Sequence, residues 1–345
     1  MWPSLQSAFV IDYPKKREVF AAMFRDRVIH HLYFNYTHEM FERTFIADSY
    51  SCIAGRGTHY GINRLSQHIR SESRNWKEKC YAMNLDIRGY FMHIVRSRLL
   101  EIANDTLKKM SDHQVSRHGR ECWRDVRDID FLLWLTEQIV MLDPKTSCEI
   151  VGDWSDWDDL DHNKSLFYTP PGCGLPIGNL TSQLYSNVYL NVFDQFMKRE
   201  LKCRHFGRYV DDSYVVSRDK REMLAMVPDI RDFISERLGL ELHMGKLHVR
   251  DIRHGVEFLG AFVKPYRNYV SNKTVERMMQ TLETVDLSNP EKTMHSVNSY
   301  LGVLSHTASY NLRRKIFLDG RFDNVLDFDS NILVSEPLKA FRFPK

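Results

Sequence analysis

The chain has 345 residues, of which 43% are hydrophobic and 27% are charged, with a formal net charge of +3. These proportions are typical of a globular protein and exclude a disordered or collagen-like chain. No apolar run approaches the roughly 20 residues that a membrane-spanning helix needs. The six cysteines are dispersed and form no C-x-x-C pair, so neither a disulfide framework nor a zinc module is indicated. We therefore expect a cytoplasmic protein that binds no membrane.

The first 80 residues are expected to combine short strands with amphipathic helices. The stretch "AFVIDYPKKREVFAA" predicts two strands around a Pro-Lys-Lys turn, and a long helical pattern follows it. A glycine-rich loop, "CIAGRGTHYG", then precedes a second helix. Lys and Arg outnumber Asp and Glu over residues 1–120, a balance that is compatible with a polyanionic partner but is also common on solvated surfaces.

The middle of the chain begins with a buried strand. "CYAMNLDIRGYFMHI" predicts a strand that ends at Asp86 and is followed by a short helix. Residues 97–141 are predicted to be helical, whereas the acidic residues 142–165 are expected to form an inserted surface loop. Trp154 and Trp157 in that loop suit either a docking surface or packing on their own domain.

Strands and helices alternate until about residue 270. A helix is predicted from Ser182 to Lys202, and "RYVDDSYVV" then predicts a tight strand-turn-strand. A further helix ends near "SERLGLEL", and strands return at "VEFLGAFV". Beyond Asn272 the pattern is helical, and its core stripe consists of Val297, Leu301 and Leu304. We therefore place a domain boundary near 270.

Three aspartates form the strongest candidate for a catalytic centre. Asp86 ends an apolar strand, and Asp211 and Asp212 lie side by side between two strands. Adjacent like charges repel, but a nucleotidyl transfer that uses two divalent ions needs carboxylates on converging strands, with the metals about 3.5–4 Å apart. Bound cations would offset that repulsion. The pattern therefore favours a metal site over a solvated turn.

Five motifs in a fixed order resemble the palm of reverse transcriptases: "NLDIRGYF", "GLPIGNLTSQ", "YVDD", "LGLELHMGK" and "FLG". The resemblance implies an α+β right-hand polymerase fold. Its fingers would occupy residues 1–80 and its palm, an antiparallel sheet packed on helices, residues 81–270. Its helical thumb would occupy residues 271–345. Few residues precede "YPKKR", so the fingers are expected to be truncated at the N-terminus.

The resemblance also implies an RNA-directed DNA polymerase that depends on two Mg²⁺ ions, with Mn²⁺ as a possible substitute. Asp86 and Asp211 resemble the main metal ligands, with Asp212 supporting them and the backbone carbonyl of Ile87 completing the set. Lys246 matches a lysine that protonates the departing pyrophosphate. A lysine in an exposed turn with no catalytic role is the alternative for Lys246.

Nucleotide and template contacts follow from the same resemblance. Among the basic residues near the first turn, Arg17 and Lys15 match the triphosphate-binding segment of the fingers. Phe91 matches the family's sugar gate, although a core role is an equal alternative and Tyr90 is a rival. The other expected nucleotide-binding residues are Ile177, Gly178 and Gln183. The expected template-primer contacts are Arg56, Gly57, Phe258, Leu259, Gly260, Arg313, Arg314 and Lys315.

The glycine motif indicates the subtype. Most reverse transcriptases have Gln before the glycine, whereas this chain has Ile177 before Gly178 and ends the motif with Gln183. That pattern is similar to the enzymes of diversity-generating retroelements, which copy a template RNA with frequent errors opposite adenine. Packing of Ile177 against Leu175 is a purely structural alternative. A retron-type or phage-defence enzyme, or an RNA-binding maturase-like protein with weak polymerase activity, are alternative functions.

The expected partners follow from that function. They are a template RNA, the RNA-DNA hybrid, deoxynucleoside triphosphates and a small helical accessory protein.

Overall fold

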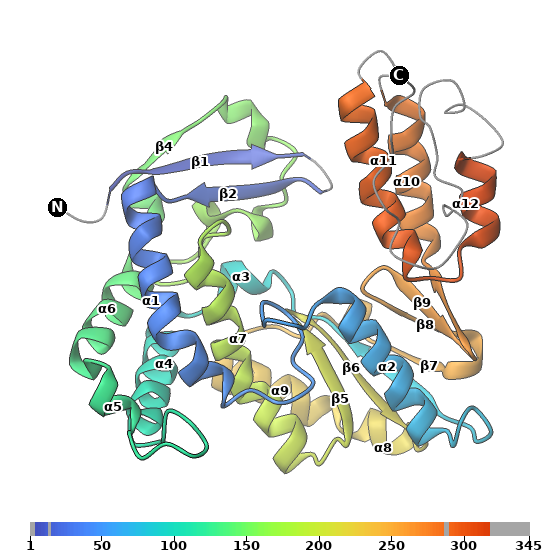
Figure 1. Ribbon diagram of the computed structural model, residues 1–345, viewed down its shortest axis with the longest axis horizontal. Helices are drawn as coiled ribbons and strands as arrows, with labels where there is room; N and C mark the ends of the chain where they lie inside the picture. The colour runs from blue at the N-terminus through green and yellow to red at the C-terminus, as the bar shows by residue number, and fades with distance from the viewer. Residues whose placement is uncertain (1–3, 13–14, 286–289, 318–345) are drawn as a thin grey trace. The chain divides into compact units, whose positions relative to one another are not determined.

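The computed structural model describes residues 4–12, 15–285 and 290–317 (Figure 1). The chain divides into two compact units. The first comprises Met1–Gly57, Met83–Val215 and Arg221–His248. The second comprises Thr58–Ala82, Val216–Lys220 and Val249–Lys345. The boundaries of these units differ from the boundaries expected for fingers, palm and thumb. That division of the chain stays a prediction.

The first unit begins with a small three-stranded sheet. Strands β1 (Gln6–Ile11) and β2 (Arg17–Ala21) pair antiparallel, with Ile11 opposite Arg17. The two predicted strands are therefore confirmed, whereas the predicted turn at Pro-Lys-Lys lies partly outside the described residues. Strand β4 (Cys148–Ile150) pairs parallel with β1 on its other side, so residues far apart in the sequence complete the sheet.

Helices surround the long helix α7 in the first unit. Helix α1 (Phe24–Glu42) and helix α4 (Arg96–Ser111) both pack against α7 (Leu180–Gln195), as Figure 1 shows. A π-helical turn, Phe196–Glu200, continues α7. The expected helical stretch at 97–141 is interrupted, because α5 (Trp123–Val126) and α6 (Ile129–Met141) follow a polar loop after α4.

The four-stranded sheet that carries the aspartates has the strand order β5-β6-β3-β7. Its strands are β5 (His205–Tyr209), β6 (Asp212–Ser217), β3 (Tyr81–Leu85) and β7 (His248–Asp251). Helix α3 (Tyr90–His93) follows β3, and helices α8 (Lys220–Ala225) and α9 (Val227–Leu238) follow β6. Helix α9 ends at Gly239, whose φ of +65° is accessible to glycine at little cost.

The acidic segment 142–165 is not simply a surface loop, which corrects the expectation. Besides β4, it contains the short turns Trp154–Trp157 and His162–Lys164. Trp157 is 5% exposed and its Nε1 donates to Glu18 Oε2 at 2.7 Å. Trp154 is 57% exposed but its ring lies 5.1 Å from that of Phe167. Both tryptophans thus pack on their own unit. The acidic composition of the segment did not indicate this packing.

The second unit joins helix α2 (Thr58–Glu72) with a three-stranded sheet and three helices. The sheet has the order β10-β9-β8, with strands β8 (Val256–Phe258), β9 (Ala261–Lys264) and β10 (Arg267–Val270). Helices α10 (Asn272–Thr284), α11 (Pro290–Ser305) and α12 (Tyr310–Phe317) follow. The predicted stripe of Val297, Leu301 and Leu304 lies in their shared core. None of the helices described here is long and apolar enough to cross a membrane.

Candidate active site

The three predicted aspartates lie at the ends of neighbouring strands. Asp86 directly follows β3, Asp211 lies in the two-residue turn between β5 and β6, and Asp212 begins β6. Burial raises the pKa of Asp211, and the charge of Asp86 raises it further. Burial also raises the pKa of Asp212 to about 7, with contributions from Asp211 and Asp86. The three carboxylates therefore share one electrostatic field.

Lys246 joins this group from a distant part of the sequence. It lies in the short turn Met244–Lys246, and its Nζ donates to Asp86 Oδ2 at 2.9 Å. Burial opposes the ammonium charge, but the hydrogen bond to Asp86 and the three aspartate charges outweigh it and raise the pKa of Lys246. Lys246 thus places a positive charge beside the carboxylates, although its side chain is 57% exposed.

The donor set suits a hard divalent cation, which takes oxygen ligands. In the part of the chain described here, no three His, Cys, Asp or Glu side chains already form a metal-binding arrangement. The raised pKa values of Asp211 and Asp212 nevertheless show that the site favours added positive charge.

The carbonyl of Ile87 is directed away from its neighbouring segment. Ile87 is bridged antiparallel to Leu242. The hydrogen bonds of that bridge come from the flanking groups, Arg88 N–H to the Glu241 carbonyl and His243 N–H to the Asp86 carbonyl. In such a pair the central carbonyl points to the opposite side. This geometry leaves the Ile87 carbonyl a candidate ligand.

A family model matches part of the chain that contains three of these four charged residues. The model described as "Reverse transcriptase (RNA-dependent DNA polymerase)" matches residues 134–263, which include Asp211, Asp212 and Lys246. This part of the chain is therefore similar to reverse transcriptases, which agrees with the expected enzyme class. No curated protein matched the chain.

Solved structures share the fold of this chain. Telomerase from Candida albicans, solved with a fragment of telomeric RNA, aligns with a TM-score of 0.52 and 12% identity over 92% of this chain and 55% of that chain. Apo telomerase from Candida tropicalis aligns with a TM-score of 0.52 and 10% identity over 91% of this chain and 60% of that chain. The right-hand polymerase fold is therefore confirmed. The chain spans little more than half the length of these telomerases.

The glycine motif is hydrogen-bonded to strand β2. The Phe20 N–H donates to the Ile177 carbonyl at 2.8 Å, and the Ala22 N–H donates to Asn179 Oδ1 at 3.3 Å. Gly178 has a φ of +133°, and a Cβ at this position would lie 2.6 Å from the Phe20 carbonyl oxygen. Only glycine fits here without displacing β2. Gln183 is exposed on the first turn of α7, where it can reach a ligand.

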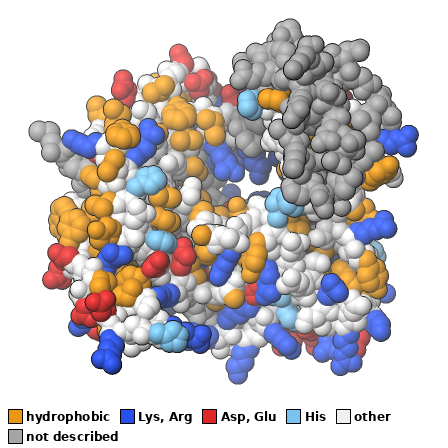
Figure 2. All heavy atoms as spheres, viewed as in Figure 1, with side chains coloured by type: hydrophobic (Ala, Val, Ile, Leu, Met, Phe, Trp, Pro, Cys, Tyr) orange, Lys and Arg blue, Asp and Glu red, His pale blue; other side chains and the backbone are white. Residues whose placement is uncertain are grey.

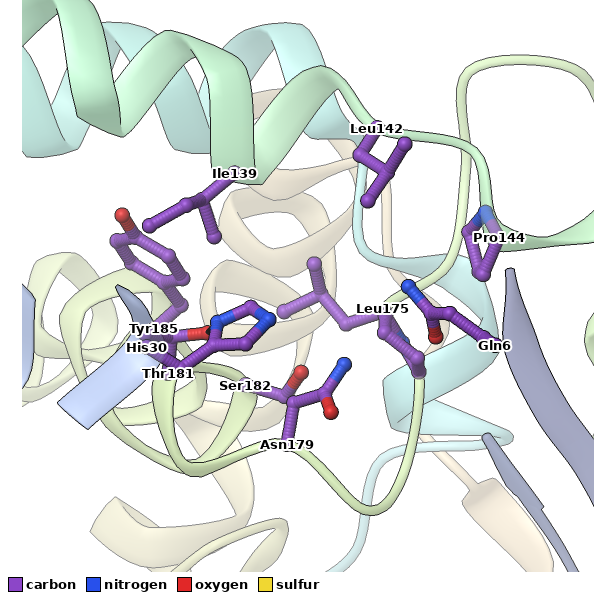
Figure 3. A pocket seen from close by; sticks show the side chains of 11 residues that line it. Gln6, His30, Ile139, Leu142, Pro144, Leu175, Asn179, Thr181, Ser182 and Tyr185 are labelled. Carbon is purple, nitrogen blue, oxygen red and sulfur yellow. Dashed lines mark hydrogen bonds between the residues drawn. The ribbon is translucent and has the colours of Figure 1, made fainter. Parts of the chain in front are cut away.

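A small cavity lies behind this motif (Figure 3). His30 from α1 faces Thr181 there, with 2.8 Å between His30 Nδ1 and Thr181 Oγ1. Burial lowers the pKa of His30 to about 4, so the ring is neutral at pH 7. The cavity measures about 10 Å³, which is room for roughly one water molecule. The cavity is lined in part by the glycine motif and is too small for a nucleotide.

Ile177 and Phe91 lie beside the same apolar cluster. Both are partly buried and pack against a core that consists of Ala8, Phe20, Met92 and Leu166. Tyr90, the rival to Phe91, is 2% exposed and its hydroxyl donates to the Ser186 carbonyl at 2.5 Å. Tyr90 therefore braces α7, and Phe91 stays the predicted sugar gate.

Two basic residues near the start of β2 act electrostatically on the aspartates. Lys15 and Arg17 are both exposed. The charge of Arg17 acts on Asp211, and that of Lys15 acts on Asp212, in each case favouring the carboxylate. The structure thus brings the predicted triphosphate-binding residues and the predicted metal ligands into one field.

Arg56 is engaged within its own loop. Its Nη1 donates to the carbonyls of Ser49 at 2.8 Å and Ile46 at 3.3 Å. These bonds assign the guanidinium a structural role that the loop sequence alone did not indicate. Gly57, with a φ of +154°, has open space where a side chain would lie, so its backbone remains accessible.

In the second unit, the predicted primer-grip residues form a tight hairpin turn. Phe258 is buried, whereas Leu259 and Gly260 have φ values of +51° and +79°. Positive φ at both central residues is the pattern of a type I′ turn, and it is unusual for leucine. The Gly260 carbonyl accepts from the Ser271 N–H at 2.9 Å, which ties the turn to the start of α10.

The basic residues of α12 that are predicted to contact the duplex differ in burial. Arg313 is 2% exposed, and desolvation lowers its pKa, so its guanidinium lies inside the helical core and not on the surface. This corrects the expectation that Arg313 is available to a duplex. Arg314 and Lys315 are exposed and keep that role as predictions.

Glu18 was missed by sequence reasoning. It is 1% exposed, and its carboxylate accepts hydrogen bonds from Ser165 Oγ at 2.6 Å and the Leu166 N–H at 2.6 Å, in addition to Trp157. A glutamate beside exposed basic residues carries no local signal of burial. Glu18 anchors the segment 142–165 to the strand that carries Arg17.

The raised pKa of Asp212 predicts a pH-dependent stability in the absence of metal. Because its folded pKa of about 7 exceeds the ordinary value, its contribution to the free energy of unfolding is present at low pH and decreases as the pH rises through 7. Asp212→Asn lacks this titration. Because Asp212 is exposed, solvent screening weakens the effect. Between pH 5 and pH 8 we expect the free energy of unfolding of the variant to rise by about 1 kcal/mol relative to that of the wild type.

Denaturant unfolding in a chelating buffer at both pH values measures this difference. Asp232→Asn is the matched control, because Asp232 is exposed and pairs with its neighbour Arg231. A stability difference between wild type and Asp212→Asn that is the same at pH 5 and pH 8 would contradict the prediction.

Proposed function

We propose that the chain copies an RNA template into cDNA by two-metal nucleotidyl transfer, as the error-prone enzyme of a diversity-generating retroelement. The observation that carries the polymerase chemistry is the shared field of Asp86, Asp211 and Asp212 with Lys246. The subtype rests on the glycine motif, in which Ile177 precedes Gly178. Template RNA, RNA-DNA hybrid and deoxynucleoside triphosphates are the ligands we propose, and the cytoplasm is the proposed location.

The proposed roles follow from the donor chemistry. Asp86, Asp211 and the Ile87 carbonyl would hold two Mg²⁺ ions, with Asp212 in support, and the ions would activate the primer hydroxyl and stabilise the charge that develops on the phosphates. Arg17 and Lys15 bind the triphosphate, because charge-assisted hydrogen bonds suit phosphate oxygens. Lys246 holds a proton at Nζ that it can deliver to the departing pyrophosphate.

Primer extension tests the proposed activity directly. The purified chain is incubated with a primer annealed to an RNA template, all four deoxynucleoside triphosphates and Mg²⁺ or Mn²⁺, with a chelator as control. We expect extension that requires the RNA template and the cation. RNA binding without any extension under either cation would favour the maturase-like alternative.

Ile177→Gln is expected to lower misincorporation opposite template adenines by about tenfold. Ile177 is partly buried and packs against the same apolar cluster as Phe91, so a glutamine there introduces a hydrogen-bonding group near the expected nucleotide site. Such a group penalises a poorly fitting pair, because a badly placed partner leaves it unsatisfied. Sequencing of the cDNA measures the error spectrum.

Ile177→Val is the matched control, since it keeps the apolar character and should retain the wild-type errors. An unchanged spectrum in Ile177→Gln would remove this residue from the account of fidelity. Uniformly faithful copying of adenines by the wild type would favour the retron-type or phage-defence alternative.

The accessory protein also remains a proposal. Helix α1 presents an apolar ridge whose residues are each separated by one helical turn, so they lie along one side of the helix. The ridge consists of Phe24, Val28, Leu32 and Tyr36, which are 78%, 53%, 43% and 42% exposed. Figure 2 shows hydrophobic side chains over this edge of the first unit, where α1 and α6 lie. This ridge is the surface that best fits a helical partner.

A further inference from the structure

The turn that carries Asp211 contains a strained residue. Val210 has a φ of +54°, although its branched Cβ disfavours the left-handed region. A residue held in this region is strained, and the strain persists only when its surroundings enforce it. Positive φ at the first of two turn residues is the pattern of a type II′ turn, where glycine is usual. Contacts around Val210 must therefore maintain this conformation.

Both peptide groups of Val210 are held by buried side chains. The Val210 N–H donates to Ser51 Oγ at 3.3 Å, and the Val210 carbonyl accepts from Arg208 Nη1 at 2.9 Å. Arg208 is fully buried, and its guanidinium also donates to the two carboxylate oxygens of Asp194, each at 2.7 Å. Asp194 lies on α7 and is fully buried as well. The turn is thus linked through one arginine to the central helix.

Asn187 closes this network. Ser51 Oγ donates to Asn187 Oδ1 at 2.9 Å, and Asn187 Nδ2 donates back to the Ser51 carbonyl at 2.7 Å. Arg208 Nη1 also reaches Asn187 Oδ1 at 3.3 Å. The backbone adds to it, because the Arg208 N–H donates to the Asp48 carbonyl at 2.9 Å. Three segments that are distant in the sequence therefore converge on the Val210 peptide groups.

We propose that Arg208 is a positioning residue that, anchored by Asp194, holds Val210 in its left-handed conformation and so directs Asp211 toward the metal-binding site. This inference rests on the proposed polymerase function. A buried ion pair often contributes no more stability than well-packed apolar residues of similar size. The contact between Arg208 and the Val210 carbonyl explains what this pair does instead: it specifies the conformation of the catalytic turn.

Arg208→Lys tests the proposal, because a lysine keeps the charge but lacks the planar fork that joins Asp194 to the Val210 carbonyl. We expect kcat of primer extension to fall about 10- to 100-fold through misplacement of Asp211, with KM for the nucleotide nearly unchanged. Mn²⁺ binding to the free protein, measured by electron paramagnetic resonance, should weaken about tenfold.

Arg96→Lys is the matched control. Arg96 is also a buried arginine that joins a carboxylate, Asp143 at 2.9 Å, to a backbone carbonyl, that of Leu142 at 2.9 Å, but it does not contact the catalytic turn. It should lose comparable thermal stability and keep its kcat and Mn²⁺ affinity. Equal losses of kcat and Mn²⁺ affinity in the two variants would overturn the proposal.

A second substitution separates positioning from folding. Glycine adopts the φ of Val210 without strain, so adding Val210→Gly to Arg208→Lys should restore kcat to within about fivefold of Val210→Gly alone. If Arg208→Lys does not fold, Arg208→Met combined with Asp194→Leu removes both buried charges, and the same rescue is expected in that background. Failure of Val210→Gly to rescue a folded variant would overturn the proposal.

The two proposals can fail separately. An inactive wild type would refute the polymerase function, and the Mn²⁺ titrations of Arg208→Lys and Arg96→Lys would still decide the role of Arg208. An active wild type with equal effects in both variants would refute only the positioning role.

Discussion

Asp211→Asn is expected to reduce primer extension by about a thousandfold, which corresponds to roughly 4 kcal/mol of transition-state stabilisation. The substitution keeps the size of the side chain but removes the charge that a divalent cation needs. Asp211 lies at the centre of the site, since its pKa is raised by burial and by Asp86 and is opposed by Lys246 and Arg17.

The same variant should remain folded. In the metal-free protein the charge of Asp211 is unfavourable, as its raised pKa shows, so Asp211→Asn should melt no lower than the wild type in a chelating buffer at pH 8. Single-turnover extension and thermal melting measure the two effects, with Asp232→Asn as control. Extension within tenfold of the wild type would contradict the assignment of Asp211 as a ligand.

Gly178→Ala is expected to have the second largest effect, a loss of about 2–4 kcal/mol in the free energy of unfolding from overpacking and backbone strain. The added Cβ would lie 2.6 Å from the Phe20 carbonyl oxygen and 3.0 Å from Val19 Cγ1. The first of these atoms belongs to the backbone of β2, which cannot rotate away. Strand β2 must therefore shift, and Arg17 at its start shifts with it.

Activity should change in a characteristic way. Because Arg17 is the expected triphosphate ligand, KM for the nucleotide should rise about tenfold or more in Gly178→Ala, in addition to any loss of stability. Gly172→Ala is the matched control: its φ of +76° is also positive, but no atom lies within 4 Å of the added Cβ. Equal effects of the two substitutions on KM would show that the contact with β2 is unimportant.

Local features of the sequence predicted the parts of the fold that depend on neighbouring residues. Strands β1 and β2 follow from the two apolar runs on either side of Pro-Lys-Lys, and the hairpin at Asp211 follows from two β-rich runs around it. The core stripe at Val297 and Leu301 follows from helical spacing. In each case the signal lies within about ten residues.

Neighbouring residues in the sequence did not indicate which charged side chains are buried. Arg313 and the neighbouring Arg314 look alike in the sequence, yet the packing of α12 buries one and exposes the other. Glu18 looks like a solvated charge until residues 157–166 fold over it. The free energy of a charge depends on what surrounds it in three dimensions, and those surroundings come from distant segments.

Sequence patterns indicated which residue types stand at the strand ends and which turn carries the paired aspartates. The partners of those residues became visible only in the folded chain. Folding brought Lys246 to Asp86 and joined Arg208 to Asp194 and Val210. The physical reason is that hydrogen bonds and ion pairs act over a few ångströms in space, whereas sequence patterns report only on neighbours along the chain.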